Sequence, residues 1–309
     1  MLVFSFLLAC LLPFDVFLFS YAVLGPLHYL TELHWLKRKN FFVKKTHAGK
    51  FLFFALCVVG LLFIIYLNVA LFRANIIYGS IIGLFFIFSA YLILISEKNY
   101  AKFLAVFLLL ILILLSFFKP SLIILLGLFL PTLIHVYIFT ALFMISGYLR
   151  SSHITALFTV ILLLAIPFMI AFLPVENFVF SRERSEKVFN STGFKIINEQ
   201  LVFLTGKNIS VVSGVLKVQI FIAFAYTFHY LNWFVKTSVI GWARSLSLKN
   251  TLFVSAIWIL SIALYLYNYQ MGLTVLFVLS MLHVLAEFPL NALSVRTVFQ
   301  KLISRNDKT

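Results

Sequence analysis

Charged residues are scarce in this sequence. They account for 11% of 309 residues, and only 9 side chains are acidic. Hydrophobic residues make up 63% of the chain, and its mean hydropathy is +1.12. A chain of this composition cannot cover the surface of a water-soluble domain, so the composition predicts a polytopic integral membrane protein.

Cysteine is also nearly absent, with two residues, Cys10 and Cys57, both inside apolar segments. This excludes a disulfide framework. The apolar segments lack the alternation of polar and apolar residues that is typical of a membrane barrel. Helices are then the remaining way to satisfy the backbone inside lipid, so we expect an all-α fold.

A helix needs about 20 apolar residues to cross the hydrocarbon core of a membrane, and the chain contains about nine such stretches, or eight if two are joined. They cover residues 5–30, 51–72, 76–96, 103–118, 121–147, 154–174, 213–235, 251–268 and 271–294. Residues 1–309 are therefore expected to form a single membrane domain, a transmembrane helix bundle.

Basic residues fall mostly on alternate loops, which predicts the orientation of the bundle. Lys37, Arg38 and Lys39 follow the first apolar stretch, and no basic residue precedes it. We expect a retained first helix with the N-terminus outside, the C-terminus inside and residues 175–212 as an extracytoplasmic loop. The net charge of +15 then reflects topology and contact with inner-leaflet lipids, with no need for nucleic acid. A bacterial inner membrane is the expected location. The alternative, a cleaved signal peptide with "LLAC" at residues 7–10, lacks the basic start.

Four histidines lie on predicted helices that run in the same direction. They are His28, His135, His229 and His283, and each precedes the next basic residue on the inner side by 7 to 15 positions. At 1.5 Å per residue, this spacing places all four between the midplane and the inner interface. His34 lies nearer the interface, and His47 and His153 fall in loops.

A single histidine in a membrane helix is more often a hydrogen-bonding group between helices. Four histidines at one depth favour a shared metal ion, because imidazole is the commonest metal ligand and coordination compensates a buried lone pair. The four are therefore candidate metal ligands. On ligand type alone, the ion could be iron, copper or zinc.

Glu32 and Glu287 each follow a candidate ligand by four positions, on the same helix face as His28 and His283. We treat both as candidate catalytic groups, because a carboxylate can fix the tautomer of a ligating histidine or ligate directly. An equally weighted alternative for Glu32 is an interfacial side chain that snorkels or pairs with a basic residue.

The segment around His229, "AYTFHYLNWF", contains three further candidates. Asn232 lies one turn after His229 and could join the chemistry. Tyr230 and Trp233 could wall a flat apolar ligand or cofactor.

The four histidine segments, in order and spacing, resemble the Brp/Blh family of membrane β-carotene 15,15′-dioxygenases. The segments are "GPLHYLTE", "LIHVYIF", "TFHYLNWF" and "MLHVLAEF". The family has two histidines on one helix face in its later motif, whereas Trp233 stands four positions after His229 here. Glu32 stands where the family has Asp, and Tyr29 and Leu30 replace small residues.

This resemblance implies a membrane-embedded oxygenase with Fe(II) held by the four histidines. Its substrates would be O2 and a lipid-soluble polyene, with β-carotene cleaved to retinal as the first expectation. Two alternatives of other classes stay open, a proton-coupled transporter and a structural membrane protein with interhelical His and Glu. A di-iron desaturase is disfavoured, because it needs several clustered histidine pairs.

Overall fold

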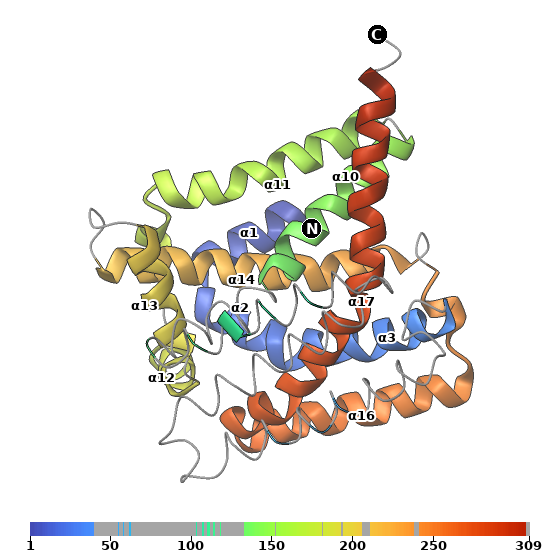
Figure 1. The fold of residues 1–309 in the computed structure, drawn as a ribbon. Helices are drawn as coiled ribbons and strands as arrows, with labels where there is room; N and C mark the ends of the chain where they lie inside the picture. The colour runs from blue at the N-terminus through green and yellow to red at the C-terminus, as the bar shows by residue number, and fades with distance from the viewer. Residues whose placement is uncertain are drawn as a thin grey trace.

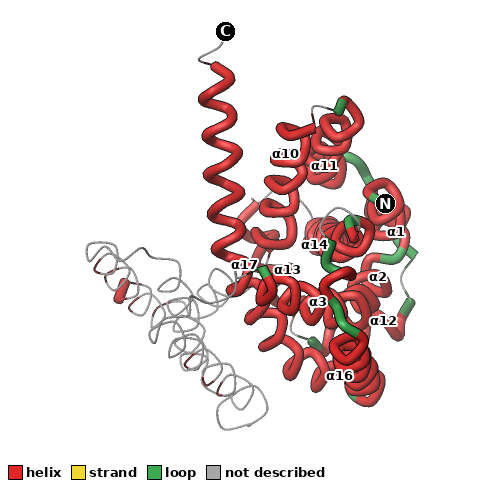
Figure 2. The backbone as a smooth tube through the Cα atoms, turned by 90° about the vertical axis from the view of Figure 1, so that its right-hand side faces the viewer, coloured by secondary structure: helices red, strands yellow, loops and turns green. Residues whose placement is uncertain are grey.

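The computed structural model describes residues 1–39, 133–151, 153–180, 182–192, 194–205, 211–237 and 241–306, together with isolated positions between 55 and 118. Throughout these ranges the regular structure is helical and contains no strand (Figures 1 and 2). The all-α prediction is confirmed for this part of the chain. The predicted spans 51–72, 76–96 and 103–118, the first part of 121–147, and His47 lie outside the continuously described residues.

Helices and shorter helical turns make up the described ranges. In chain order they are α1 (Leu2–Leu11), α2 (Pro13–Phe19), the π-helical turn η1 (Ser20–Leu24), α3 (Gly25–Arg38), the π-helical turn η3 (Ile134–Phe139), α10 (Thr140–Ser151), α11 (Ile154–Phe172), the 3-10 turn η4 (Val175–Phe178), α12 (Glu183–Ser191), α13 (Phe194–Thr205), α14 (Val211–Val235), the 3-10 turn η5 (Ala243–Ser245), α16 (Leu248–Tyr267) and α17 (Tyr269–Asn306).

Four helices in the described ranges are long and apolar enough to cross a membrane: Pro13–Arg38, Ile154–Phe172, Val212–Val235 and Leu248–Tyr267. The first and third are central, with 61% of their most apolar window buried, whereas α11 and α16 are peripheral at 22% and 17%. Figure 2 shows α14 surrounded by other helices. In Figure 1, α3 and α14 run in one direction and α11 and α16 in the other. The outer faces of α11 and α16 expose large apolar side chains such as Phe168 and Leu266, as expected of a lipid-facing surface.

The first predicted span, residues 5–30, differs from the observed helices. The chain breaks at Leu12, whose φ of −135° and ψ of 56° are not helical. The cause is Pro13, because a proline ring disfavours the helical conformation of the residue before it and is well accommodated at the first helical position. A separate helix α1 therefore precedes a continuous helical segment from Pro13 to Arg38.

Two other segments also differ in extent from the expected ones. The segment 175–212, predicted as an extracytoplasmic loop, is largely helical in its described residues, which form η4, α12 and α13. The last span extends well beyond residues 271–294, because α17 continues to Asn306.

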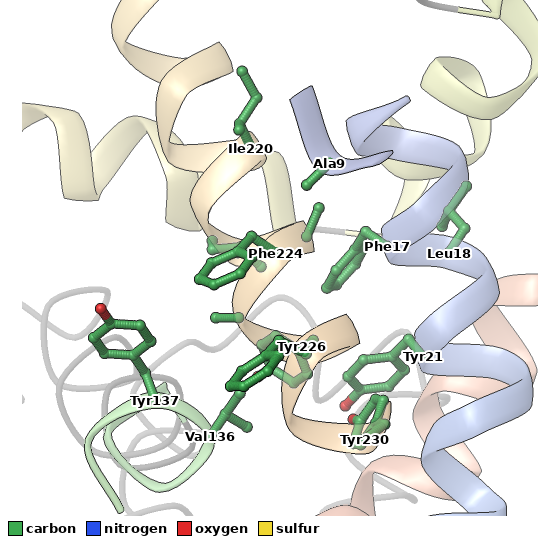
Figure 3. Packing of buried hydrophobic residues seen from close by; sticks show 14 of the residues in the cluster. Ala9, Phe17, Leu18, Tyr21, Val136, Tyr137, Ile220, Phe224, Tyr226 and Tyr230 are labelled. Carbon is green, nitrogen blue, oxygen red and sulfur yellow. The ribbon is translucent and has the colours of Figure 1, made fainter. Parts of the chain in front are cut away.

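Aromatic side chains fill the space between α2 and α14. Phe17 is fully buried, and its ring meets that of Tyr226 edge-on with a centroid separation of 5.7 Å (Figure 3). Phe194 on α13 contacts Phe17 in the same edge-on manner at 5.0 Å. Such packing holds α13 against α2 and α14. The hydrophobic core therefore continues from the helices of segment 175–212 into the bundle.

A residue of η3 replaces the backbone hydrogen bond that a proline inside α11 removes. Pro167 has no N–H, so the carbonyl of Leu163, four residues earlier, loses its helical partner. The hydroxyl of Tyr137 donates to that carbonyl at 2.7 Å. This bond satisfies a buried backbone group and ties α11 to the π-helical turn that contains His135.

Candidate metal centre

Four buried histidines meet at one point of the bundle. His28 comes from α3, His135 from η3, His229 from α14 and His283 from α17. One ring nitrogen of each lies within 4.8 Å of the corresponding atom of the others, and the four side chains are 1–8% exposed. Two ligands on opposite sides of one ion stand about 4.2 Å apart, since metal–nitrogen bonds are about 2.1 Å. The cluster could therefore hold a metal ion after a sub-ångström contraction.

Two of the ligand nitrogens are identified by their hydrogen bonds. The Nε2 atoms of His28 and His229 are 3.0 Å apart, close to the spacing of about 3.0 Å for two nitrogens at right angles on one ion. Nδ1 of His229 lies 2.8 Å from Oγ1 of Thr140. The Thr140 hydroxyl donates its hydrogen to the carbonyl of Val136, so it accepts from Nδ1–H of His229. This tautomer leaves a lone pair on Nε2 of His229, which faces the centre.

His135 is held by a carboxylate on another helix. Oε2 of Glu287 lies 2.8 Å from Nδ1 of His135, and Nε2 of His135 has no hydrogen-bond partner in the described part of the chain. Asn291, one turn further along α17, donates to the same Oε2 at 3.3 Å. Glu287 thus contacts a candidate ligand on another element, His135, and its ion-pair contact in the described ranges is not with His283 of its own helix.

His283 has no hydrogen bond from either ring nitrogen within the described ranges, although it is 2% exposed. Its ring stacks on Tyr29 with a centroid separation of 4.1 Å. A buried polar atom without a partner costs about 1–3 kcal/mol, so unpartnered nitrogens on His283 and His135 are unfavourable unless a ligand compensates them. A metal ion would compensate both, and this observation makes the site fit such an ion.

The carboxylates add the charge that a metal ion would balance. Glu32 is 1% exposed and Glu287 is 5% exposed, and the two carboxyl groups interact with each other. Their ion-pair contacts in the described ranges are with His28 and His135 rather than with lysine or arginine. The alternative of a snorkelling Glu32 is wrong, because the side chain is buried. A divalent cation beside the two carboxyl groups would compensate the negative charge that burial otherwise disfavours.

Two π-helical turns occur beside the ligands. His135 lies within η3, and η1 ends just before the segment that contains His28. A π-helical turn leaves backbone carbonyls without their usual partners, and such turns are frequent at functional sites. Near η1 these carbonyls are satisfied from outside, by Tyr269 on Leu18 at 3.1 Å and by Trp258 on Val23 at 2.8 Å. The Leu18 and Val23 carbonyls near this widened turn are therefore paired.

A tyrosine pair supports two of the histidines. The hydroxyls of Tyr29 and Tyr230 are 2.5 Å apart, and the Tyr230 ring lies 5.2 Å from that of His28. Gly25 permits this arrangement, because a Cβ there would stand 3.0 Å from the Tyr29 hydroxyl and 3.3 Å from that of Tyr230. The pair thus connects the ring stacked on His283 with the ring beside His28.

The other candidate residues vary in their distance from the cluster. Trp233 donates to Oγ1 of Thr31 at 3.0 Å, and its ring lies 5.3 Å from that of His28. Asn232 is half-buried, and no hydrogen bond joins its side chain to the histidines in the described part of the chain. His34 is outside the group of four, and His153 is exposed before α11.

Sequence reasoning missed Thr140 and the supporting role of Tyr29. Thr140 follows His135 by five positions, but its partner is His229 on a different helix, so local spacing gives no signal for it. In the sequence, Tyr29 stands out only as a bulky residue where the family that the motifs resemble has a small one, and nothing there indicates its contacts with His283 and Tyr230.

Comparison of this chain with protein-family models, curated proteins and solved structures finds no match to any of them.

Proposed function

We propose that this protein is an integral membrane oxygenase that uses non-haem iron to cleave or oxidise a carotenoid or a similar lipid-soluble polyene. The observation that carries the proposal is the group of four buried histidines, each contributing a ring nitrogen within 4.8 Å of the others. The order and spacing of the four histidine motifs add the resemblance to the β-carotene dioxygenases.

The choice of metal rests on the resemblance and on ligand type. Neutral imidazoles suit iron, copper and zinc, and the family favours Fe(II). The iron, when bound, would supply the activation of O2 for reaction with an alkene. The chain itself would hold the ligands in place through Thr140 and Glu287, and its apolar surroundings would exclude water and accept an apolar substrate.

The membrane arrangement is part of the proposal. We propose about nine spans, an external N-terminus and loop 175–212, and an internal C-terminus in a bacterial inner membrane. Reporter fusions at residues 1, 190 and 309 test this topology. An external C-terminus would contradict it.

The activity is tested by expressing the chain in a bacterium that accumulates β-carotene. Cleavage at the central double bond by one O2 gives two molecules of retinal, so the cells should lose colour and an aldehyde should appear in the extract. The His229→Ala variant should leave the pigment intact, while His153→Ala, at an exposed position, should bleach it like the parent chain. Unchanged pigment in aerated, iron-replete cells that contain the protein in their membrane would contradict carotene cleavage.

A further inference from the structure

The two buried carboxylates of the site have different surroundings. Oε2 of Glu287 already has two neighbours, Nδ1 of His135 at 2.8 Å and Nδ2 of Asn291 at 3.3 Å. The contact with Nδ1 of His135 is an ion-pair contact, and neither ring nitrogen of His135 forms a hydrogen bond in the described ranges. With Nδ1 facing the carboxylate, Nε2 is the nitrogen available to an ion, and Glu287 would then hold the ring in orientation.

Glu32 contacts the nitrogen of His28 that faces His229. Its Oε2 is 3.0 Å from Nε2 of His28, the same nitrogen that faces Nε2 of His229 at 3.0 Å. Nδ1 of His28, the nitrogen on the far side of the ring, has no hydrogen-bond partner in the described ranges. The Glu32 carboxylate is therefore next to the nitrogen that points toward the centre.

The contact between Glu32 and His28 is close without being a hydrogen bond. Oε2 of Glu32 is buried and has no hydrogen-bond partner in the described part of the chain, despite the 3.0 Å separation. The hydrogen bond of Nε2 of His28 is made with His229 instead. A spacing of about 3.0 Å between donor atoms is what adjacent ligands at right angles on one ion show. The two contacts of Nε2 of His28, one with the Glu32 oxygen and one with the His229 nitrogen, each have the spacing of neighbouring ligands.

We propose that Glu32 is a fifth, anionic ligand to a divalent first-row transition metal ion held by the four histidines, and that Glu287 is a positioning residue for His135. This inference rests on the metal centre of the proposed function and not on its substrate.

Cobalt(II) provides the test, because its visible absorption bands report the donor atoms and the geometry of the ion. Co²⁺ is titrated into the purified full-length chain in detergent, and the same titration is made with Glu32→Gln and Glu287→Gln. Loss of a ligand should change the shape and intensity of the bands in Glu32→Gln. Glu287→Gln should keep the parent band shape while binding about 10–100-fold more weakly.

Glu183→Gln serves as the matched control, because Glu183 is an exposed acid on α12 with its side chain 83% exposed. Its titration should equal that of the parent chain. If Glu32→Gln shows the parent spectrum, or if both site variants show the same change, the ligand role of Glu32 is overturned while the metal centre stands. If the parent chain binds no Co²⁺, the metal centre and the proposed function fall together.

If Glu32→Gln does not fold, a measurement on the parent chain tests whether a carboxylate binds the ion. Infrared difference spectra of the parent chain before and after Co²⁺ addition should show a shift of carboxylate bands. The shift should persist in Glu287→Gln and Glu183→Gln, since neither residue is proposed to touch the ion. Absence of this shift in a chain that binds Co²⁺ would overturn the proposal.

Discussion

Nε2 of His28 and Nε2 of His229 face each other at 3.0 Å across 201 residues of sequence. Two nitrogens at this distance can share one proton, and His229 keeps its own proton on Nδ1 for Thr140. As a hydrogen bond, this contact has its proton on His28. A metal ion bound between the two rings would take the place of that hydrogen bond, so each histidine should matter for metal content.

Alanine substitution of any of the four clustered histidines should lower bound metal at least about tenfold, because a buried ion has few replacement ligands. Metal analysis of the purified protein in detergent measures this content. His153→Ala is the control, since His153 is exposed and outside the cluster. An equal loss in His153→Ala, or less than about a tenth of an ion per parent chain, would leave the histidines as interhelical hydrogen-bonding groups.

Thr140→Val should weaken metal binding about 10–100-fold, because it removes the acceptor that fixes the His229 tautomer. Thr140→Ser keeps the hydroxyl and should restore most of the affinity. Thr159→Val is a matched control, since the Thr159 hydroxyl bonds to the carbonyl four residues earlier on the exposed side of α11. Isothermal titration with the metal ion compares the three variants. A parent-like affinity in Thr140→Val would show that the bond does not orient the ligand.

Gly25→Ala should destabilise the bundle by about 1–3 kcal/mol, because the added methyl group would force the Tyr29 and Tyr230 hydroxyls apart. Gly147→Ala on α10 is the control, since its Cβ meets nothing within 4 Å. Alanine is the better helix former there, so this variant should be neutral or more stable by about 0.5–1 kcal/mol. Unfolding in mixed detergent measures both. Equal stability of the two variants would contradict a close-packed tyrosine pair.

Tyr137→Phe should cost about 0.5–1.5 kcal/mol, because it removes the hydrogen bond to the Leu163 carbonyl. The loss should shrink when Pro167 is replaced by Ala, since an alanine N–H can then bond to the same carbonyl. A double-mutant cycle on unfolding free energies isolates this coupling. Strictly additive effects of the two substitutions would show that the Tyr137 hydroxyl does not compensate the proline.

The convergence of the four histidines could be predicted from sequence, whereas their neighbours could not. Helical rise and the positions of basic residues predict where each histidine lies along its own helix, and this was enough to suggest one shared site. The rotation of each helix about its axis depends on packing against elements far away in sequence. Thr140 with His229, and Glu287 with His135, are pairs of this second kind.

Local departures from regular helix geometry were the other feature that the sequence pattern did not predict. Periodicity treats a helix as regular, but η1 and η3 are π-helical, and the chain breaks at Leu12. The proline after Leu12 is visible in the sequence, whereas the widened turns depend on partners such as Trp258 and Tyr269 that supply the missing hydrogen bonds. The four-residue spacing of His28 and Glu32 did give a real contact, because one unbroken helix contains both.

The origin of the four histidines on four separate elements has a consequence for biogenesis. Residues are synthesised in order, and α17 follows the other three elements along the chain. Until α17 inserts, His135 lacks its carboxylate and the centre lacks His283. A nascent chain without α17 would therefore hold an incomplete set of donors for an ion. Metal loading would then be a late step of maturation, and any factor that delivers the ion would have to act on the fully inserted bundle.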